Sequence, residues 1–170
     1  MNGNKLTKEL CLNRLSLFLG LGNMAACQLV RAISGSPYDM IHKFNLADVL
    51  PPMWLFNFLS LVFSFLIGGA VGIIVGKAQC YVDIFSVISA YRGGLCYVSL
   101  IFLSLIWYPV FFSGAHLWLS LLIALLIVVC SVGCFCFWMK IDAFASLVLA
   151  GYGLWSIYIL IMNISVYLFN

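Results

Sequence analysis

The sequence has very few charged residues. Among its 170 residues, eight are Lys or Arg and five are Asp or Glu, which makes a charged fraction of 8% against an apolar fraction of 65%. Soluble proteins average about 25% charged residues, so a soluble fold of this composition could not cover its own surface. The basic residues are scattered and form no face that would neutralise phosphates, which excludes nucleic acid as a partner. The sequence therefore predicts an integral membrane protein in contact with a lipid bilayer.

Histidine is also scarce, and no acidic residue lies deep in an apolar run. The two histidines, His42 and His116, have no carboxylate at a spacing typical of a catalytic triad or a metal site. We expect His116 to cap a helix at the membrane interface; axial ligation of a haem iron is the alternative. The lack of intramembrane acids argues against an ion-coupled transporter. We predict no catalytic residues.

Cysteine, in contrast, occurs seven times. The densest group is Cys130, Cys134 and Cys136, which lies inside an apolar run with no histidine nearby. The paired Cys-x2-Cys arrangement of a zinc site is absent. We interpret these cysteines as small apolar packing residues and predict no metal site.

Long apolar runs dominate the chain. A helix rises about 1.5 Å per residue, so roughly 20 apolar residues cross the hydrocarbon core, and five runs qualify: 10–33, 53–76, 92–112, 115–139 and 144–169. Only helices satisfy their backbone hydrogen bonds within each span. We predict an all-α integral membrane protein, a bundle of five transmembrane helices in one domain over residues 1–170. The first run is too long for the apolar part of a signal peptide and is predicted to be the first span.

Two of the connections between these runs are longer than the others. Residues 34–52 form a polar loop, whereas residues 81–91 are largely apolar and either lie at the interface or lead into the third helix. Gly93 and Gly94 would allow a bend there.

The basic residues predict the orientation. Those on the side of the N-terminus outnumber those on the other side by six to two; they are Lys5, Lys8, Arg14, Lys77, Arg92 and Lys140, against Arg31 and Lys43. Basic residues accumulate on the cytoplasmic side of membrane proteins. We therefore predict a multi-pass protein with a cytoplasmic N-terminus.

Small and amide residues within the runs predict helix–helix contacts. Gly68, Gly72 and Gly76 form a small-x3-small ridge that lets helix backbones approach closely. The ridge would pack either within the subunit or across a dimer. Asn57 and Asn163 are expected to make hydrogen bonds between helices.

The aromatic residues divide into two groups. Trp54, Trp118 and Trp138 fall near the predicted interfaces, where tryptophan commonly anchors helices. The deeper aromatics follow helical spacing and share faces with neighbouring residues; these faces are Ser104, Trp107, Tyr108 and Phe111 on the third run, and Tyr152, Trp155 and Ile159 on the fifth. Composition alone favours core packing over a slot for a flat ligand.

Three segments resemble the TspO/MBR family of translocator and tryptophan-rich sensory proteins. Residues 107–112 read Trp-Tyr-Pro-Val-Phe-Phe and resemble the family's Trp-Ser/Thr-Pro-Leu-Phe-Phe. Tyr152-x2-Trp155-x7-Asn163 is similar to its Tyr-x2-Trp and following asparagine, and residues 51–54 resemble its Pro-Pro-x-Trp. The chain is thus identified as a diverged, bacterial-type member.

The resemblance implies a five-helix bundle that forms a homodimer, with a pocket opening toward the first long loop. Such pockets bind porphyrins, haem and other lipophilic molecules without a covalent bond, and the protein would act as a receptor, sensor or carrier. The ligand-binding residues expected between the second, third and fifth helices are Trp54, Ser60, Ser104, Trp107, Tyr108, Phe111, Tyr152, Trp155 and Ile159.

The sequence departs from the family at two of these positions. Ser60 replaces a second tryptophan, whose indole is linked in bacterial relatives to light-dependent porphyrin breakdown, and Ser104 replaces an asparagine. We therefore expect a binding protein rather than an enzyme. Porphyrin photo-oxidation is one alternative, and a small regulatory or assembly subunit of another membrane protein is a second.

Overall fold

Five long helices make up the fold. The structure, a computed structural model, describes residues 3–34, 51–78, 84–113 and 116–169, and the side chains of these residues except 3–13, 53 and 113. The helices are α1 (Gly3–Ile33), α3 (Met53–Ala78), α4 (Ile84–Ser113), α5 (Leu117–Trp138) and α6 (Ala143–Phe169). Each contains a segment long and apolar enough to cross a membrane. The predicted five-helix membrane protein is confirmed.

The helices extend beyond the apolar runs at several ends. The largest extension that includes described side chains is at the start of α4, which begins at Ile84, whereas the apolar run begins at residue 92. Residues 84–91 therefore lead directly into this helix and do not form a separate interfacial segment. The backbone of α4 is helical through Gly93 and Gly94. Most of the polar loop, residues 35–50, lies outside the described residues.

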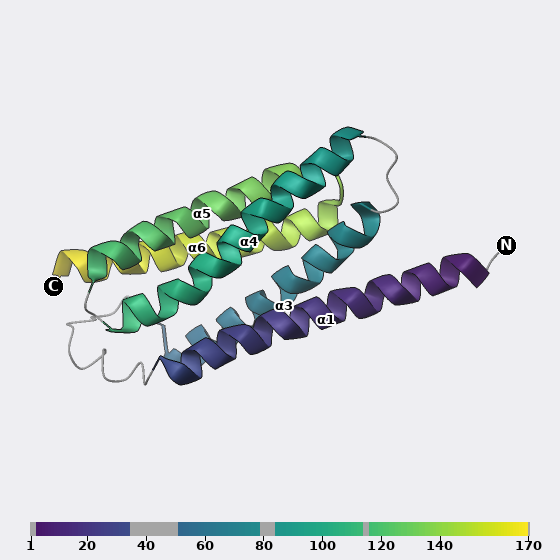
Figure 1. The fold of residues 1–170 in the computed structure, drawn as a ribbon. Helices are drawn as coiled ribbons and strands as arrows, with labels where there is room; N and C mark the ends of the chain where they lie inside the picture. Colours follow the sequence, from purple (N-terminus) through teal and green to yellow (C-terminus); the bar gives the residue numbers. More distant parts are fainter. Residues whose placement is uncertain (1–2, 35–50, 79–83, 114–115, 170) are drawn as a thin grey trace.

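The helices pack in two groups (Figure 1). In one group α1 lies along α3; in the other α4 packs on α5, and α5 packs on α6. Contacts of α3 with α6 and of α1 and α3 with α4 join the two groups. The two termini lie at opposite ends of the bundle (Figure 1), as five crossings require.

Glycine residues allow α1 and α3 to pack closely. A Cβ atom on Gly68 would lie 2.6 Å from the carbonyl oxygen of Leu19, and one on Gly72 would lie 2.3 Å from the Cα of Ser16. Real Cβ atoms do not approach backbone atoms this closely, so only glycine fits at either position. These two members of the glycine ridge are thus used within the subunit, and not across a dimer.

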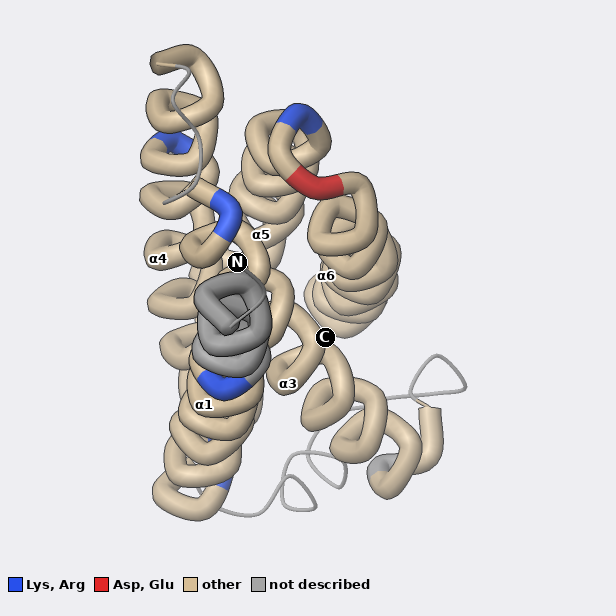
Figure 2. Tube along the Cα trace, turned by 90° about the vertical axis from the view of Figure 1, so that its right-hand side faces the viewer, with Lys and Arg blue, Asp and Glu red and all other residues tan. Residues whose placement is uncertain are grey.

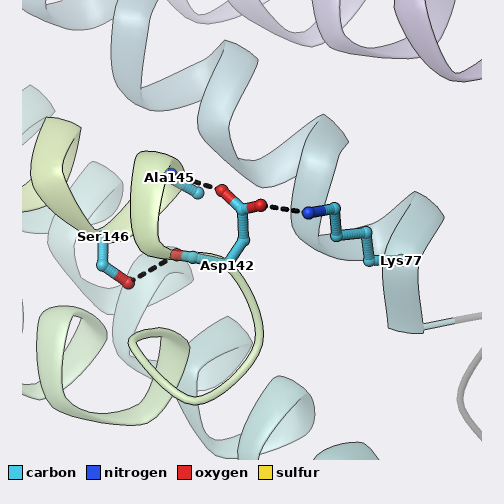
Figure 3. Close-up of polar contacts among 4 residues, drawn as sticks. All are labelled: Lys77, Asp142, Ala145 and Ser146. Carbon is cyan, nitrogen blue, oxygen red and sulfur yellow. Dashed lines mark hydrogen bonds and ion pairs between the residues drawn. The ribbon is translucent and has the colours of Figure 1, made fainter.

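An ion pair joins the two groups at the end of the bundle that holds the N-terminus. Lys77, near the end of α3, pairs with Asp142, which precedes α6 (Figure 3). Asp142 also caps α6, because its Oδ1 accepts a hydrogen bond of 2.7 Å from the backbone N–H of Ala145. Figure 2 shows an acidic segment, in red, where α6 begins.

Candidate functional site

A small cavity lies between the two helix groups. Its volume is about 60 Å³, and it lies in the part of the bundle nearer to the end of α1 and the start of α3. All five helices contribute to its wall. The lining residues are Cys27, Val30, Arg31, Ser60, Ser64, Ser104, Leu105, Trp107, Tyr108, Ile127, Tyr152, Trp155 and Ile159.

Aromatic rings in mutual contact surround the cavity on α3, α4 and α6. The indole of Trp107 stacks on Phe111, with ring centroids 5.0 Å apart and an interplanar angle of 16°. Trp155 stacks on Phe63 at 5.9 Å and 21°, and its centroid lies 5.4 Å from that of Phe56. Offset and tilted pairs at these distances are favourable arrangements of aromatic rings. Phe56 of α3 also lies 6.4 Å from Trp107 between ring centroids, so this ring is in contact with both indoles.

The serine hydroxyl groups of the cavity wall and the hydroxyl of Tyr152 already have hydrogen-bond partners. Ser60 and Ser64 donate to carbonyl oxygens one turn earlier on α3, at 2.8 and 2.7 Å. The Ser104 hydroxyl donates to the carbonyl of Leu100 at 2.8 Å and lies 2.9 Å from the hydroxyl of Tyr152. Since the single proton of Ser104 is used on its own helix, Tyr152 is the donor in that contact.

Among the residues that the structure describes, Arg31 is the one charged residue in the cavity wall. Its guanidinium carbon lies 5.2 Å from the ring centroid of Tyr108, within the range of a cation–π contact. Its Nη1 donates to the backbone carbonyl and to the side-chain oxygen of Asn57, both at 3.4 Å. These contacts link α1 to α3 and α4, so Asn57 makes the interhelical hydrogen bond expected of it.

The second asparagine acts between α4 and α6. The indole N–H of Trp107 donates to Oδ1 of Asn163 at 3.4 Å, and Nδ2 of Asn163 donates to the carbonyl of Ile159 at 2.7 Å. Asn163 is buried, and together these two bonds use both ends of its amide. The prediction of an interhelical hydrogen bond at Asn163 is confirmed.

The structure brings most of the predicted site residues together. Seven of the nine line the cavity; they are Ser60, Ser104, Trp107, Tyr108, Tyr152, Trp155 and Ile159. The other two do not. Phe111 is 1% exposed and packs behind Trp107, and Trp54 is 70% exposed near the start of α3. The binding role of each residue stays a prediction.

Sequence reasoning missed the contribution of α1. It placed the site between the second, third and fifth helices, whereas Cys27, Val30 and Arg31 of α1 also line the cavity. Ser64 was missed as well, although its i+4 relation to Ser60 places both on one face of α3. His116 precedes α5, is exposed and lies outside the cavity wall. Its side chain makes no capping hydrogen bond, and its carbonyl instead accepts from Leu119 and Ser120.

Size limits what the cavity holds in this conformation. A water molecule needs roughly 10–15 Å³ of such space, so about 60 Å³ accommodates a few waters. Sites for drug-sized ligands usually measure about 300–1,000 Å³. A flat ligand of that size would require the aromatic side chains to rotate or the two helix groups to separate.

The fold and this cavity define a multi-pass membrane protein with an aromatic-walled site between two helix groups. The sequence model of the TspO/MBR family matches residues 17–168, nearly the whole chain. The chain belongs to the TspO/MBR family. The comparison with curated proteins finds no match.

Proposed function

We propose that this protein is a membrane-embedded binding protein for porphyrins, haem or similar flat lipophilic molecules. Family membership supports this function, and one observation carries it: Trp107 and Tyr108 of α4 and Tyr152 and Trp155 of α6 border one cavity. Ring faces on two helices that border the same cavity favour a ligand that is itself flat and apolar. The protein would act as a receptor, sensor or carrier.

The side-chain chemistry favours binding over catalysis. The hydroxyls of Ser60, Ser64 and Ser104 donate to main-chain carbonyls of their own helices, which leaves none of them poised as an activated nucleophile. At Ser60, where relatives carry the indole linked to porphyrin breakdown, a small hydroxyl lines the cavity. The homodimer and the cytoplasmic N-terminus stay predictions.

Trp155→Ala should weaken porphyrin binding several-fold. Trp155 lines the cavity and stacks on Phe63 and Tyr158, and an aromatic pair contributes about 0.5–1.5 kcal/mol beyond the burial of area. Protoporphyrin IX is titrated into the purified protein in detergent, and the dissociation constant is read from the porphyrin absorption. In the wild type, tryptophan emission should be quenched in parallel.

Trp118→Ala is the matched control. Trp118 lies on α5, is 59% exposed and does not line the cavity, so its removal should leave the affinity unchanged. Absence of binding at micromolar porphyrin would overturn the proposed function. Equal weakening by the two substitutions would show that porphyrin binds the apolar surface and not the cavity.

A further inference from the structure

Arg31 has no acidic partner in the part of the chain that the structure describes. Asp142 is the only acidic side chain described, and it is paired with Lys77. The turn that carries Asp142 lies at the opposite end of the bundle from the end of α1 (Figure 1). The side chains of Glu9, Asp39, Asp48 and Asp83 are not among those that the structure describes. A charged group on a membrane helix that faces the interior of the bundle, as Arg31 does from the cavity wall, usually marks a functional site.

The hydrogen-bonding capacity of Arg31 is only partly used. A guanidinium carries five N–H donors in a planar fork, and both of its hydrogen bonds to Asn57 come from Nη1, at the long distance of 3.4 Å. Nη2 and Nε have no hydrogen-bond partner among the described residues. The contact with the ring of Tyr108 holds the group in the wall of the cavity without using these donors.

The cavity is therefore chemically asymmetric. Trp107 and Trp155 supply ring faces, whereas Arg31 supplies a positive charge near the end of α1, two residues before Ile33. We propose that Arg31 binds a carboxylate of the ligand, so that the preferred ligand class is a flat hydrophobic molecule carrying an acid group at its edge. This inference rests on the proposed function. A guanidinium fork matches a carboxylate in a two-point contact.

The orientation of the ligand follows from the same geometry. Arg31 lies close to the membrane surface at which α1 ends, whereas Trp155 and Ile159 lie deeper along α6. An acid group on Arg31 would remain near the interface, and the apolar ring system would extend between α4 and α6. This arrangement keeps the charge of the ligand away from the hydrocarbon core.

The test compares protoporphyrin IX with its dimethyl ester, which has the same ring system and no carboxylate. The wild type should bind the acid at least about tenfold more tightly than the ester, as expected for a charge-assisted hydrogen bond. Arg31→Gln should abolish this preference and leave the affinity for the ester nearly unchanged. Arg31→Lys keeps the positive charge but loses the planar guanidinium, so it should still prefer the acid over the ester, but less strongly than the wild type.

Arg14→Gln is the matched control for charge. Arg14 is on the same helix, exposed and outside the cavity wall, so this variant should discriminate acid from ester as the wild type does. Equal affinities of the wild type for acid and ester would overturn the inference while leaving the proposed function intact. An unchanged preference for the acid in Arg31→Gln would also overturn the inference and leave the proposed function intact. If neither the acid nor the ester binds, both the inference and the proposed function are overturned.

Discussion

Among single residues, Gly93 shows most directly how a side chain on one helix limits another. Trp138 of α5 is 1% exposed, and its indole lies against Gly93 of α4, where a Cβ atom would come within 2.1 Å of Nε1. The indole N–H has no hydrogen-bond partner among the described residues. Trp138 is therefore held by its packing, and Gly93 provides the space for it.

Gly93→Ala should destabilise the protein by about 1–3 kcal/mol, as is typical of overpacking a closely packed interior. Gly94→Ala is the control, because a Cβ atom there meets nothing within 4 Å; it should be neutral or slightly stabilising. The melting temperatures of both variants in detergent give the comparison. Adding Trp138→Phe to Gly93→Ala should recover part of the loss, and equal melting temperatures for the two alanine variants would contradict the packing account.

Trp138 also illustrates what sequence reasoning could not determine about single residues. Its position near the end of an apolar run predicts an interfacial anchor, as for Trp54 and Trp118, and for Trp138 that prediction is wrong. Depth in the membrane can be read from position in a run, but the face of the helix cannot, because all sides of α5 are apolar. Trp54 and Trp118 are exposed whereas Trp138 is buried, and the difference is set by the glycine opposite Trp138.

At the scale of helices, the contact between α1 and α3 determines whether residues of α1 line the cavity. Gly72 lies against the backbone of Ser16, and Asn23 of α1 donates a hydrogen bond of 2.7 Å to the carbonyl of Ser64. This register presents Cys27 and Arg31 to the cavity. Close packing of α1 on α3 is thus needed to place the positive charge of Arg31 in the cavity wall.

Gly72→Ala should push α1 away from α3, because a Cβ atom there would lie 2.3–2.7 Å from atoms of Ser16 that belong largely to the backbone. We expect a loss of stability of more than about 1 kcal/mol and faster labelling of Cys27 by a thiol reagent. Gly69→Ala is the matched control, with its closest contact at 3.9 Å. If Cys27 reacts equally fast in the two variants, α1 is not held by this contact.

Much of the helix arrangement was predictable, and the part that was not has a physical cause. The apolar runs predict the five helices, and the spacing of Trp107 and Trp155 predicts the faces that border the cavity. The face of α1 could not be predicted, because Cys27, Val30 and Arg31 carry no aromatic or motif signal. Their orientation depends on the glycine contacts of α3, and a small-x3-small ridge does not specify its partner.

For the whole molecule, the ion pair between Lys77 and Asp142 connects the two helix groups at one end. Partial burial of the Asp142 carboxyl opposes its ionisation, but the hydrogen bond and charge of Lys77 and the backbone N–H groups of Ala145 and Phe144 outweigh this effect. The pKa of Asp142 therefore lies below its ordinary value. A carboxyl group with a lowered pKa stabilises the folded state above its unfolded pKa, and this contribution is lost as the pH falls through the folded value.

The melting temperature should accordingly fall as the pH drops from neutral to below about 3.9, the ordinary value for aspartate, and part of this fall should be missing in Asp142→Asn. Asparagine can still cap α6, so Asp142→Ala should be less stable than Asp142→Asn by about 1 kcal/mol at neutral pH. Lys77→Met should also reduce the fall in melting temperature between neutral and acidic pH, because it removes the partner of Asp142. Identical pH profiles for the wild type and Asp142→Asn would show that the pair contributes nothing.

The aromatic packing of the cavity has a consequence for any ligand that enters it. The places that a flat molecule would take beside Trp155 are held by Phe56 and Phe63. Entry would then replace one set of ring contacts with another of the same kind. Phe56 and Phe63 therefore compete with the ligand for the face of Trp155. Selectivity is left to what a ligand offers beyond a ring, such as its outline and its charge.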